Sequence, residues 1–363
     1  MSLTPDLTEM IARARADLRM GVPVVLGGPG GGAAIFAAET LDAQRLADVQ
    51  ALGGAPVLAI TARRAATLKA RAYDGDLARV MVPPDARLSW VLAVADPADD
   101  LKMPMKGPLR TARGGDAGLH RLALTLVKSA RLLPAALVLD LDDAPGFAVR
   151  HGLTLLDAGA AAPHLAEASP LNPVVSARLP LSVSEAGRLH VFRPEDGGEE
   201  HYAVEIGQPM RTAPVLARLH SACFTGDLLG SLKCDCGPQL RGALAQMGNE
   251  GAGVLLYLSQ EGRGIGLANK MRAYSLQDQG FDTVEANHRL GFEDDERDFR
   301  IGAAILAQMG FSSVRLLTNN PAKIAMMAQN GIEVVERVPL KLGETVHNQG
   351  YLATKAAKSG HLL

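Results

Sequence analysis

The chain has 363 residues, of which 47% are hydrophobic and 21% are charged, and its formal net charge is −2. This length allows two domains with separate hydrophobic cores, and the composition excludes disordered, fibrous and strongly polyanion-binding proteins. The apolar runs at 132–139 and 253–258 are far shorter than the about 20 residues that span a bilayer. Charges interrupt the first 21 residues where a secretory signal needs an apolar core. We therefore expect a cytoplasmic protein that binds neither nucleic acid nor membrane.

The first half of the chain alternates helical patterns with short apolar runs. The apolar residues Leu7, Ile11 and Leu18 predict a first helix, capped by Thr4 and ended by Gly21. Further along, strands are predicted at 22–26, 34–37, 56–61, 90–95 and 136–141, with a helix over 120–132. This alternation predicts an α/β domain over residues 1–165.

Prolines gather between residues 161 and 184, which predicts a linker at 166–185 before a second domain at 186–363. In this second domain the pattern predicts strands at 215–219, 253–259, 313–318 and 333–338 and helices at 268–278, 296–309 and 321–329. The expected fold class is α/β, of mixed α+β layers, with two domains that are each a sheet flanked by helices.

The cysteines of the chain are Cys223, Cys234 and Cys236, and they fall within fourteen residues. In a reducing compartment, such a cluster favours metal or redox chemistry over structural disulfides. Three thiolates favour a catalytic zinc site with one position open for water, whose pKa zinc lowers to about 7. His220 as a fourth ligand would instead make a closed structural site, and buried inert thiols are a further alternative.

A glycine-rich polar turn, 260–266, follows the strand predicted at 253–259. Its Arg263 can grip a phosphate with two hydrogen bonds, and its Glu261 can accept hydrogen bonds from the edge of a base. The carboxyl end of a strand suits a ligand crevice, although a plain solvated turn fits the same residues.

Two further segments are candidate anion sites. In the first, 294–298, Arg297 falls in a predicted first helical turn, where a cation is unfavourable unless Asp298, Glu296 or a substrate phosphate compensates it. The second, 318–323, joins a strand to a helix and offers hydroxyl, amide and ammonium groups. By its spacing, Tyr274 on the helix after the glycine turn is more typical of a core residue.

Taken together, these segments resemble GTP cyclohydrolase II over about residues 172–363. The matching stretches are 217–223, 225–227, 231–237, 260–266, 272–274, 277–280, 282–287, 295–299, 317–321, 336–340 and 360–363. The resemblance implies hydrolysis of GTP to 2,5-diamino-6-(5-phosphoribosylamino)pyrimidin-4-one with release of formate and pyrophosphate, the first step of riboflavin biosynthesis. It also implies a homodimer with one zinc ion per subunit and magnesium bound with the triphosphate.

The same resemblance implies roles for individual residues. Cys223, Cys234 and Cys236 bind zinc, and water rather than His220 takes the fourth position. Arg297 attacks the α-phosphate, Asp295 accepts a proton, and Tyr274 orients or activates water for opening of the guanine ring. The positions that match GTP contacts are Arg218, Gln239, Glu261, Gly262, Arg263, Thr283, Thr318 and Lys323. Two departures are Ala222, where the family usually has glutamate, and Ser259, where a basic residue is frequent.

The first domain is similar, more weakly, to 3,4-dihydroxy-2-butanone 4-phosphate synthase. The similar stretches are 21–26, 35–39, His120 with its helix, and 132–136. His120 and Asp140 are candidate remnants of that family's site, but isolated surface or core residues are the favoured interpretation of both. Where that family has an acidic magnesium-binding loop, this chain has the glycine-rich stretch 27–32, so we expect an inactive domain. The alternatives are a bifunctional enzyme that also makes dihydroxybutanone phosphate, a non-catalytic GTP-sensing homologue, and a cyclohydrolase that stops before losing formate or pyrophosphate.

Overall fold

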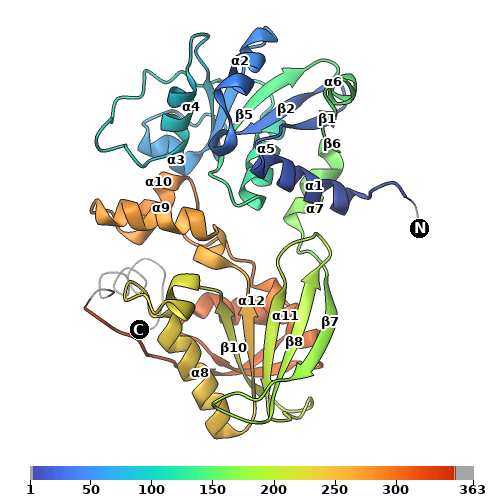
Figure 1. Ribbon diagram of the computed structural model, residues 1–363, viewed down its shortest axis with the longest axis vertical. Helices are drawn as coiled ribbons and strands as arrows, with labels where there is room; N and C mark the ends of the chain where they lie inside the picture. The colour runs from blue at the N-terminus through green and yellow to red at the C-terminus, as the bar shows by residue number, and fades with distance from the viewer. Residues whose placement is uncertain (1–2, 347, 349–363) are drawn as a thin grey trace. The chain divides into compact units, whose positions relative to one another are not determined.

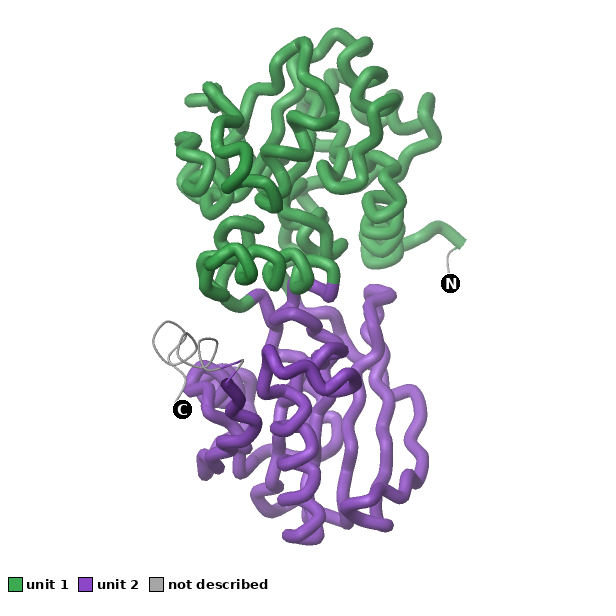
Figure 2. The backbone as a smooth tube through the Cα atoms, turned by 60° about the vertical axis from the view of Figure 1, so that its left-hand side comes forward, with its two compact units in different colours: residues 1–167, 268–295 green, residues 168–267, 296–363 purple. Residues whose placement is uncertain are grey.

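The structure is a computed structural model that describes residues 3–346 and 348, so the motif at 360–363 lies outside the described residues. The chain forms two compact units (Figure 2). Unit 1 comprises residues 1–167 and 268–295, and unit 2 comprises residues 168–267 and 296–363. The segment 268–295, predicted as part of the second domain, therefore belongs to unit 1. Tertiary contacts of that segment, described below, account for the difference.

Unit 1 is built on a six-stranded sheet in the order β4-β3-β5-β2-β1-β6, in which only the pair β1 and β6 is parallel. Its strands are β1 (Val24–Gly28), β2 (Gly31–Ala37), β3 (Val57–Thr61), β4 (Leu77–Met81), β5 (Ala135–Leu141) and β6 (Leu155–Asp157). Its helices are α1 (Leu7–Arg19), α2 (Ala43–Ala51), α3 (Ala62–Thr67), α4 (Leu88–Ala95), α5 (Gly118–Ser129), α6 (Ala144–His151), α7 (Ala158–Ala166), α9 (Leu267–Asp278) and α10 (Thr283–Leu290), with a short 3₁₀ turn η1 (Ala38–Thr40).

Side chains that alternate along the strands build a core on each face of this sheet. Val24 and Leu26 pack with α1 and α5, whereas Val25 between them packs with α2, α4 and α6 on the other face. These helices are labelled around the sheet in Figure 1. This alternation is the period of two that a strand covered on both sides must show. The predicted sheet flanked by helices is confirmed for unit 1, and the structure adds that helices cover both faces.

Two local predictions in unit 1 were wrong. The run 90–95 forms the helix α4 rather than a strand, because Val91, Val94 and Ala95 are buried at helical spacing. A continuous apolar run this short has no periodicity that would distinguish a helix from a strand. Helix α1 is capped by Asp6 rather than Thr4, since Asp6 accepts a hydrogen bond from the Glu9 amide and donates its own amide to the Glu9 carboxylate.

The glycine-rich stretch at 27–32 forms a tight hairpin between β1 and β2. Gly28 pairs with Gly31, and Pro29 and Gly30 make the turn. Gly30, at the second central position of the turn, has a φ of +85°. A turn with proline first and a positive φ second is typical of type II, and glycine adopts that φ most readily. The hairpin itself contains no carboxylate.

Unit 2 contains a seven-stranded sheet in the order β13-β12-β10-β11-β9-β8-β7. Its strands are β7 (Leu171–Arg178), β8 (Gly187–Pro194), β9 (His201–Ile206), β10 (Val215–Ser221), β11 (Gly253–Leu258), β12 (Ser313–Leu317) and β13 (Glu333–Val338). Its helices are α8 (Cys236–Glu250), α11 (Arg300–Gln308) and α12 (Pro321–Gln329), with short turns η2 (Phe224–Leu228) and η3 (Glu261–Gly264). Helix α8 packs on one face of the sheet, and α11 and α12 pack on the other (Figure 1).

The segment predicted as a linker, 166–185, holds the strand β7. This strand lies at the edge of the sheet, most of its residues are exposed, and a register irregularity follows Pro173. Proline is tolerated at an edge or a bulge because its missing N–H leaves no ladder bond unmade, so proline content misidentified this stretch. In the described part of the chain, every helix is too short or too polar to cross a membrane.

The strands that matter for function are β10 and its two parallel neighbours, β11 and β12. Parallel strands end at the same edge of a sheet, and the loops that follow them form a crevice there. The segments 222–235, 259–266 and 318–320 follow these three strands directly. Cysteines, the glycine turn and one predicted anion site are therefore brought to one edge.

Candidate active site

The three thiols lie together. Cys223 follows β10, and Cys234 and Cys236 lie at the start of α8, so two elements supply the group. The three sulfur atoms all lie within 4.8 Å of one another, and Cys223 Sγ is 3.7 Å from Cys234 Sγ. Among the described residues, this is the one group of three or more histidine, cysteine or carboxylate side chains close enough to share a metal ion. The predicted metal cluster is confirmed as a geometry able to bind a metal.

Gly226 packs directly against the three cysteines. Its amide donates to Cys223 Sγ at 3.3 Å, and a Cβ at this position would lie 2.6 Å from Cys234 Sγ and 3.0 Å from Cys223 Sγ. The sulfur atoms therefore close around a residue that has no room for a side chain. An N–H donor directed at sulfur favours the thiolate, which is the form that binds a metal.

The thiols also affect each other's ionisation. The neighbouring Cys223 raises the pKa of Cys234, and Cys223, Cys234 and burial together raise the pKa of Cys236 well above its ordinary value. Three thiolates at this separation, two of them buried, repel one another unless a cation lies between them. The donor set thus fits a divalent metal that prefers sulfur, and zinc is the common example.

His220 belongs to a supporting layer and not to the thiol group. Its Nε2 lies 3.0 Å and 3.1 Å from the two carboxylate oxygens of Asp227, and burial lowers its pKa. Asp227 also accepts hydrogen bonds from the amide of Cys223 at 2.9 Å and the hydroxyl of Tyr257 at 3.0 Å. The alternative in which His220 closes the metal site is therefore not supported. Sequence reasoning missed Asp227 and Tyr257 as supports, although Asp227 is only four residues from the first cysteine.

The glycine turn is tied to the cysteine loop. Glu261 accepts a hydrogen bond from the amide of Phe224 at 2.6 Å. Gly262 and Arg263 both have a left-handed backbone, with φ of +64° and +61°. This conformation is strained for arginine by about 1–3 kcal/mol, so the fold holds Arg263 in a fixed direction. The turn is part of a built site rather than a plain solvated loop.

Gln260 fixes the segment that carries Arg297. Its side-chain amide donates to the carbonyl of Asp298 at 2.8 Å and accepts from the amide of Asp298 at 2.9 Å. The amide of Glu296 donates to the carbonyl of Arg263 at 3.0 Å. Two short loops far apart in sequence are thereby joined backbone to backbone. Gln260 was not predicted to have this role, and a buried polar residue directly after β11 is the signal that could have shown it.

Arg297 lies before the helix rather than in its first turn. Helix α11 begins at Arg300, whose amide donates to Asp298, so the predicted helix start at 296 was wrong and the unfavourable placement of a helical cation does not arise. The Arg297 guanidinium is 3.4 Å from Ser221 Oγ at the end of β10 and 4.8 Å from the Phe299 ring centroid. A turn held on both sides by hydrogen bonds thus directs this arginine.

Two more cations lie at the same edge of the sheet. Lys323 Nζ donates to the carbonyl of Leu219 at 2.8 Å and is 5.1 Å from the same Phe299 ring. Arg218 is 8% exposed and donates to the carbonyl of Leu317 at 3.1 Å. Burial lowers the pKa of Arg218 to about 10, so it stays charged at neutral pH.

Arg218 and its neighbours form a polar chain. Arg218 donates to Gln239 Oε1 at 2.5 Å, and Gln239 Nε2 donates in turn to Asp235, between two of the cysteines. The Nε of Arg218 is buried and has no hydrogen-bond partner among the described residues. Thr318 accepts a hydrogen bond from the amide of Asn320 at 3.0 Å and shapes the loop after β12. The predicted site residues of unit 2 are thus brought to one edge, with an excess of positive charge suited to a polyanion.

Three predicted site residues belong to unit 1. Tyr274 is half-buried on α9, and its ring lies 5.7 Å from Lys270 Nζ. Thr283 is the first residue of α10 and accepts a hydrogen bond from Gln277 at 3.1 Å. Asp295 is the exposed last residue of unit 1, two positions before Arg297. Their association with the thiols stays a prediction.

The two departures from the family pattern have ordinary structural partners. The amide of Ala222 donates to the carbonyl of Leu258 at 2.7 Å and extends the pairing of β10 with β11. The Ser259 hydroxyl donates to the carbonyl of Glu200 at 2.7 Å, and its amide donates to His201 Nδ1 at 3.0 Å. Ser259 therefore links β11 to β9.

Comparison with known proteins decides the family. The family model described as GTP cyclohydrolase II matches residues 172–339. A GTP cyclohydrolase-2 from Azospirillum brasilense is 48% identical over 362 residues, which cover 97% of this chain and 93% of that relative. The chain belongs to the GTP cyclohydrolase II family. It is an enzyme of that family, as the resemblance predicted.

Other relatives match about half of the chain. A GTP cyclohydrolase-2 from Pseudomonas aeruginosa strain LESB58 is 56% identical over 190 residues, 52% of this chain and 92% of the relative. One from Neisseria meningitidis is 55% identical over 195 residues, 53% of this chain and 97% of the relative. A solved two-domain 3,4-dihydroxy-2-butanone 4-phosphate synthase from A. baumannii covers 90% of this chain at 17% identity and a TM-score of 0.34, which supports no conclusion about the first half.

Proposed function

We propose that the protein is a zinc-dependent GTP cyclohydrolase II. In this proposal it converts GTP to 2,5-diamino-6-(5-phosphoribosylamino)pyrimidin-4-one, formate and pyrophosphate, at the entry to riboflavin biosynthesis. The observation that carries the proposal is the thiol group closed around Gly226 at the sheet edge where Arg218, Arg297 and Lys323 also lie.

Cys223, Cys234 and Cys236 would hold the zinc ion. When bound by three protein ligands, zinc supplies a water molecule of lowered pKa as a nucleophile at neutral pH. The protein's own part is to hold the thiolates in place. Asp227 does this by accepting from the Cys223 amide while His220 and Tyr257 orient its carboxylate.

Arg297 is the proposed nucleophile toward the α-phosphate. A bond from the guanidinium nitrogen to phosphorus would form, the bond from phosphorus to the bridging oxygen would break, and pyrophosphate would leave, its charge offset by magnesium. The guanidinium proton passes to Asp295. Water would later cleave the nitrogen–phosphorus bond, which releases the product with its phosphate and restores Arg297. Guanidinium is ordinarily protonated and a poor nucleophile, so a fixed direction and an adjacent carboxylate are needed. The hydrogen bonds of Gln260 to Asp298 and of Glu296 to Arg263 support that fixed direction.

The remaining contacts would bind the nucleotide. Arg218, Arg263 and Lys323 suit phosphate oxygens, and Glu261 suits the donor edge of guanine. Gln239, Gly262, Thr283 and Thr318 complete the proposed contacts, and Tyr274 orients water for ring opening. We further propose a cytoplasmic homodimer.

For the first half of the chain, we propose an inactive descendant of a dihydroxybutanone phosphate synthase, ending near residue 165. The tight hairpin at 27–32 supports its inactivity, since it contains no carboxylate to bind magnesium. A second activity on ribulose phosphate is accordingly not expected. Incubation with ribulose 5-phosphate and magnesium tests this, and formation of formate would contradict it.

The main test is product analysis. Protein loaded with zinc and magnesium is incubated with GTP, and formate, pyrophosphate and the pyrimidine are measured. We expect the three in equal amounts. Absence of all three products would refute the proposed reaction and favour a GTP-sensing homologue. Pyrophosphate without formate would identify an enzyme that stops before formate is released.

A further inference from the structure

Helices α9 and α10 are held by residues far away in the sequence. At the start of this segment, Arg272 donates to the Glu39 carboxylate at 2.9 Å and lies 3.4 Å from Asp96. Asn269 donates to the carbonyl of Arg131 at 3.1 Å. Glu39 is itself fixed, because its second oxygen accepts a hydrogen bond from the amide of Leu133 at 2.7 Å. The start of the segment is therefore bound to a carboxylate whose position the first half of the chain already fixes.

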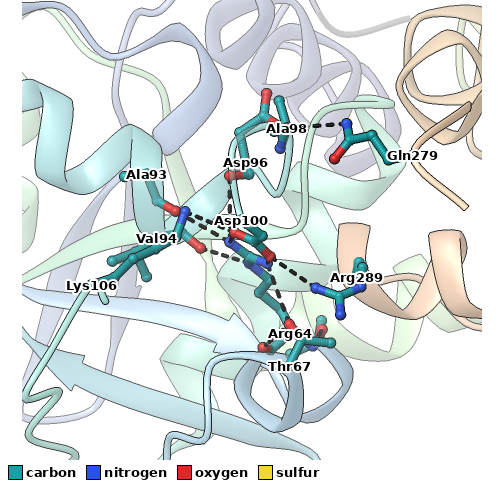
Figure 3. Close-up of polar contacts among 11 residues, drawn as sticks. Arg64, Thr67, Ala93, Val94, Asp96, Ala98, Asp100, Lys106, Gln279 and Arg289 are labelled. Atoms are coloured by element: carbon teal, nitrogen blue, oxygen red, sulfur yellow. Dashed lines mark hydrogen bonds and ion pairs between the residues drawn. The ribbon is translucent and has the colours of Figure 1, made fainter. Parts of the chain in front are cut away.

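The same pattern continues to the end of the segment. Gln279, between the two helices, donates to the carbonyl of Ala98 at 3.2 Å (Figure 3). After α10, the hydroxyl of Thr61 donates to the carbonyl of Gly291 at 2.8 Å, and Arg63 pairs with Glu293 at 2.7 Å. Contact with Thr61 is close, since a Cβ on Gly291 would lie 2.9 Å from its hydroxyl. The first half of the chain therefore contacts the segment along its whole length.

A buried ion cluster stiffens the loop that makes several of these contacts. Asp100, 7% exposed, accepts hydrogen bonds from Arg64 at 2.5 Å and 3.0 Å and pairs with Lys106 at 2.7 Å (Figure 3). Arg64 also donates to the carbonyl of Val94 at 2.8 Å. Both ends of the loop 94–100 are thereby fixed, and this loop supplies Asp96 and Ala98 to α9. Asp100 also lies 3.4 Å from Arg289 on α10.

The held face of α9 differs from the face that carries Tyr274. Asn269 and Arg272, three residues apart, lie on one side of the helix and contact the first half of the chain. Tyr274 follows Arg272 by two positions, which is about 200° around the helix axis. The anchoring side chains therefore leave Tyr274 directed away from their contacts. Thr283 begins α10 in the same held segment.

We propose that residues 3–167, the N-terminal segment, act as a holding frame for α9 and α10 and that Glu39 and Thr61 are positioning residues for ring opening. This rests on the proposed function, in which Tyr274 and Thr283 act on GTP. The family model covers residues 172–339, and relatives that align over 92% or more of their own length match only about half of this chain, which supports an N-terminal segment that supplies no reacting group. Its part is to set the place and rigidity of a helix pair that carries two site residues.

Two variants test the two ends of the frame in the full-length, zinc-loaded protein. Glu39→Gln weakens the anchor of Arg272, and the double variant Thr61→Val, Arg63→Ala removes the contacts with Gly291 and Glu293. The control is Asp76→Asn, which breaks the exposed pair of Asp76 with Arg121 inside the N-terminal segment and touches neither helix.

The first readout is hydrogen–deuterium exchange of peptides covering 268–291, with 236–250 as an internal reference. We expect faster exchange at 268–291 in both test variants, no change at 236–250, and wild-type behaviour for Asp76→Asn. Unchanged exchange at 268–291 in both test variants would overturn the holding frame. This readout does not depend on turnover.

The second readout is the ratio of formate to pyrophosphate formed from GTP in the first turnover. Displacement of Tyr274 should lower the rate of formate release by about tenfold or more relative to that of pyrophosphate, because small displacements of a catalytic group have large effects. A parallel fall of both products would show a general structural role and overturn the positioning role. Wild-type protein that releases neither product would refute the proposed function, while exchange would still decide the holding frame.

Discussion

Replacement of Gly226 by alanine tests whether the thiol group is a metal site of defined size. The backbone of Gly226 is one that any residue adopts, so only space opposes the change. The new methyl group would lie 2.6 Å and 3.0 Å from two sulfur atoms and 3.1 Å from the Cβ of Cys236, all closer than ordinary contacts. Relief requires the cysteines to move apart by several tenths of an ångström.

Overpacking of this kind costs about 1–3 kcal/mol. If that strain falls on the metal-bound state, zinc affinity should fall by about 5- to 150-fold, since 1.4 kcal/mol is a factor of ten. The assay is competition for zinc with a chromogenic chelator, together with metal content after dialysis. Gly114→Ala is the matched control, because a Cβ there would meet nothing within 4 Å and its φ is not positive.

Glycine-to-alanine substitution at 226 that leaves zinc affinity within about twofold of wild type would refute this reasoning, since a factor of two is only about 0.4 kcal/mol. Loss of affinity in the Gly114→Ala control as well would show that the effect is not local.

Three further predictions concern Arg297, Gln260 and Asp100. Arg297→Ala should abolish pyrophosphate release, by about 10³-fold or more; preserved release in a stopped assay with labelled GTP would exclude Arg297 as the nucleophile. Gln260→Ala removes both hydrogen bonds to the Asp298 backbone and should lower kcat/KM by about tenfold to a hundredfold at unchanged zinc content, whereas Gln260→Glu, which keeps the acceptor, should lower it less; equal effects would contradict the two-bond account. Burial alone would raise the pKa of Asp100, but hydrogen bonds from Arg64 and Lys106 hold it below its ordinary value. Its stabilisation is therefore complete above about pH 4 and is lost as the pH falls through the folded-state pKa. Asp100→Asn should lower the free energy of unfolding by about 3–5 kcal/mol at pH 7 and by less near pH 3, as measured by urea titration; a loss independent of pH would show that the charge is not responsible.

Local sequence was sufficient to predict the metal site, because clustered cysteines have few other roles in a reducing compartment. Three cysteines in fourteen residues pointed to a metal, and the structure brings their sulfur atoms within 4.8 Å. The strands β10, β11, β12 and β13 were all predicted, and the clearest case is β11, whose sequence GVLLYL is a short continuous apolar run that is largely buried between two neighbouring strands. Run length alone failed at 90–95, where burial at helical spacing defines α4.

Tertiary contacts decided the surroundings of each predicted residue. Cys-x10-Cys-x-Cys left His220 open as a ligand, and only the fold shows its imidazole against Asp227. Gln260 and Asp298 are 38 positions apart, and no local sequence pattern predicts that the side-chain amide of Gln260 is hydrogen-bonded to the backbone of Asp298.

What the sequence by itself determined is the chemistry available: thiols for a metal, cations for a polyanion, and a family in which these occur together. The tertiary structure alone decided that α9 and α10 belong with the first half of the chain. Glu39 and Arg272 are 233 positions apart, and such a pair forms only once both elements are folded. Hydrophobic periodicity reports the burial of one element and carries no information about which distant element covers it.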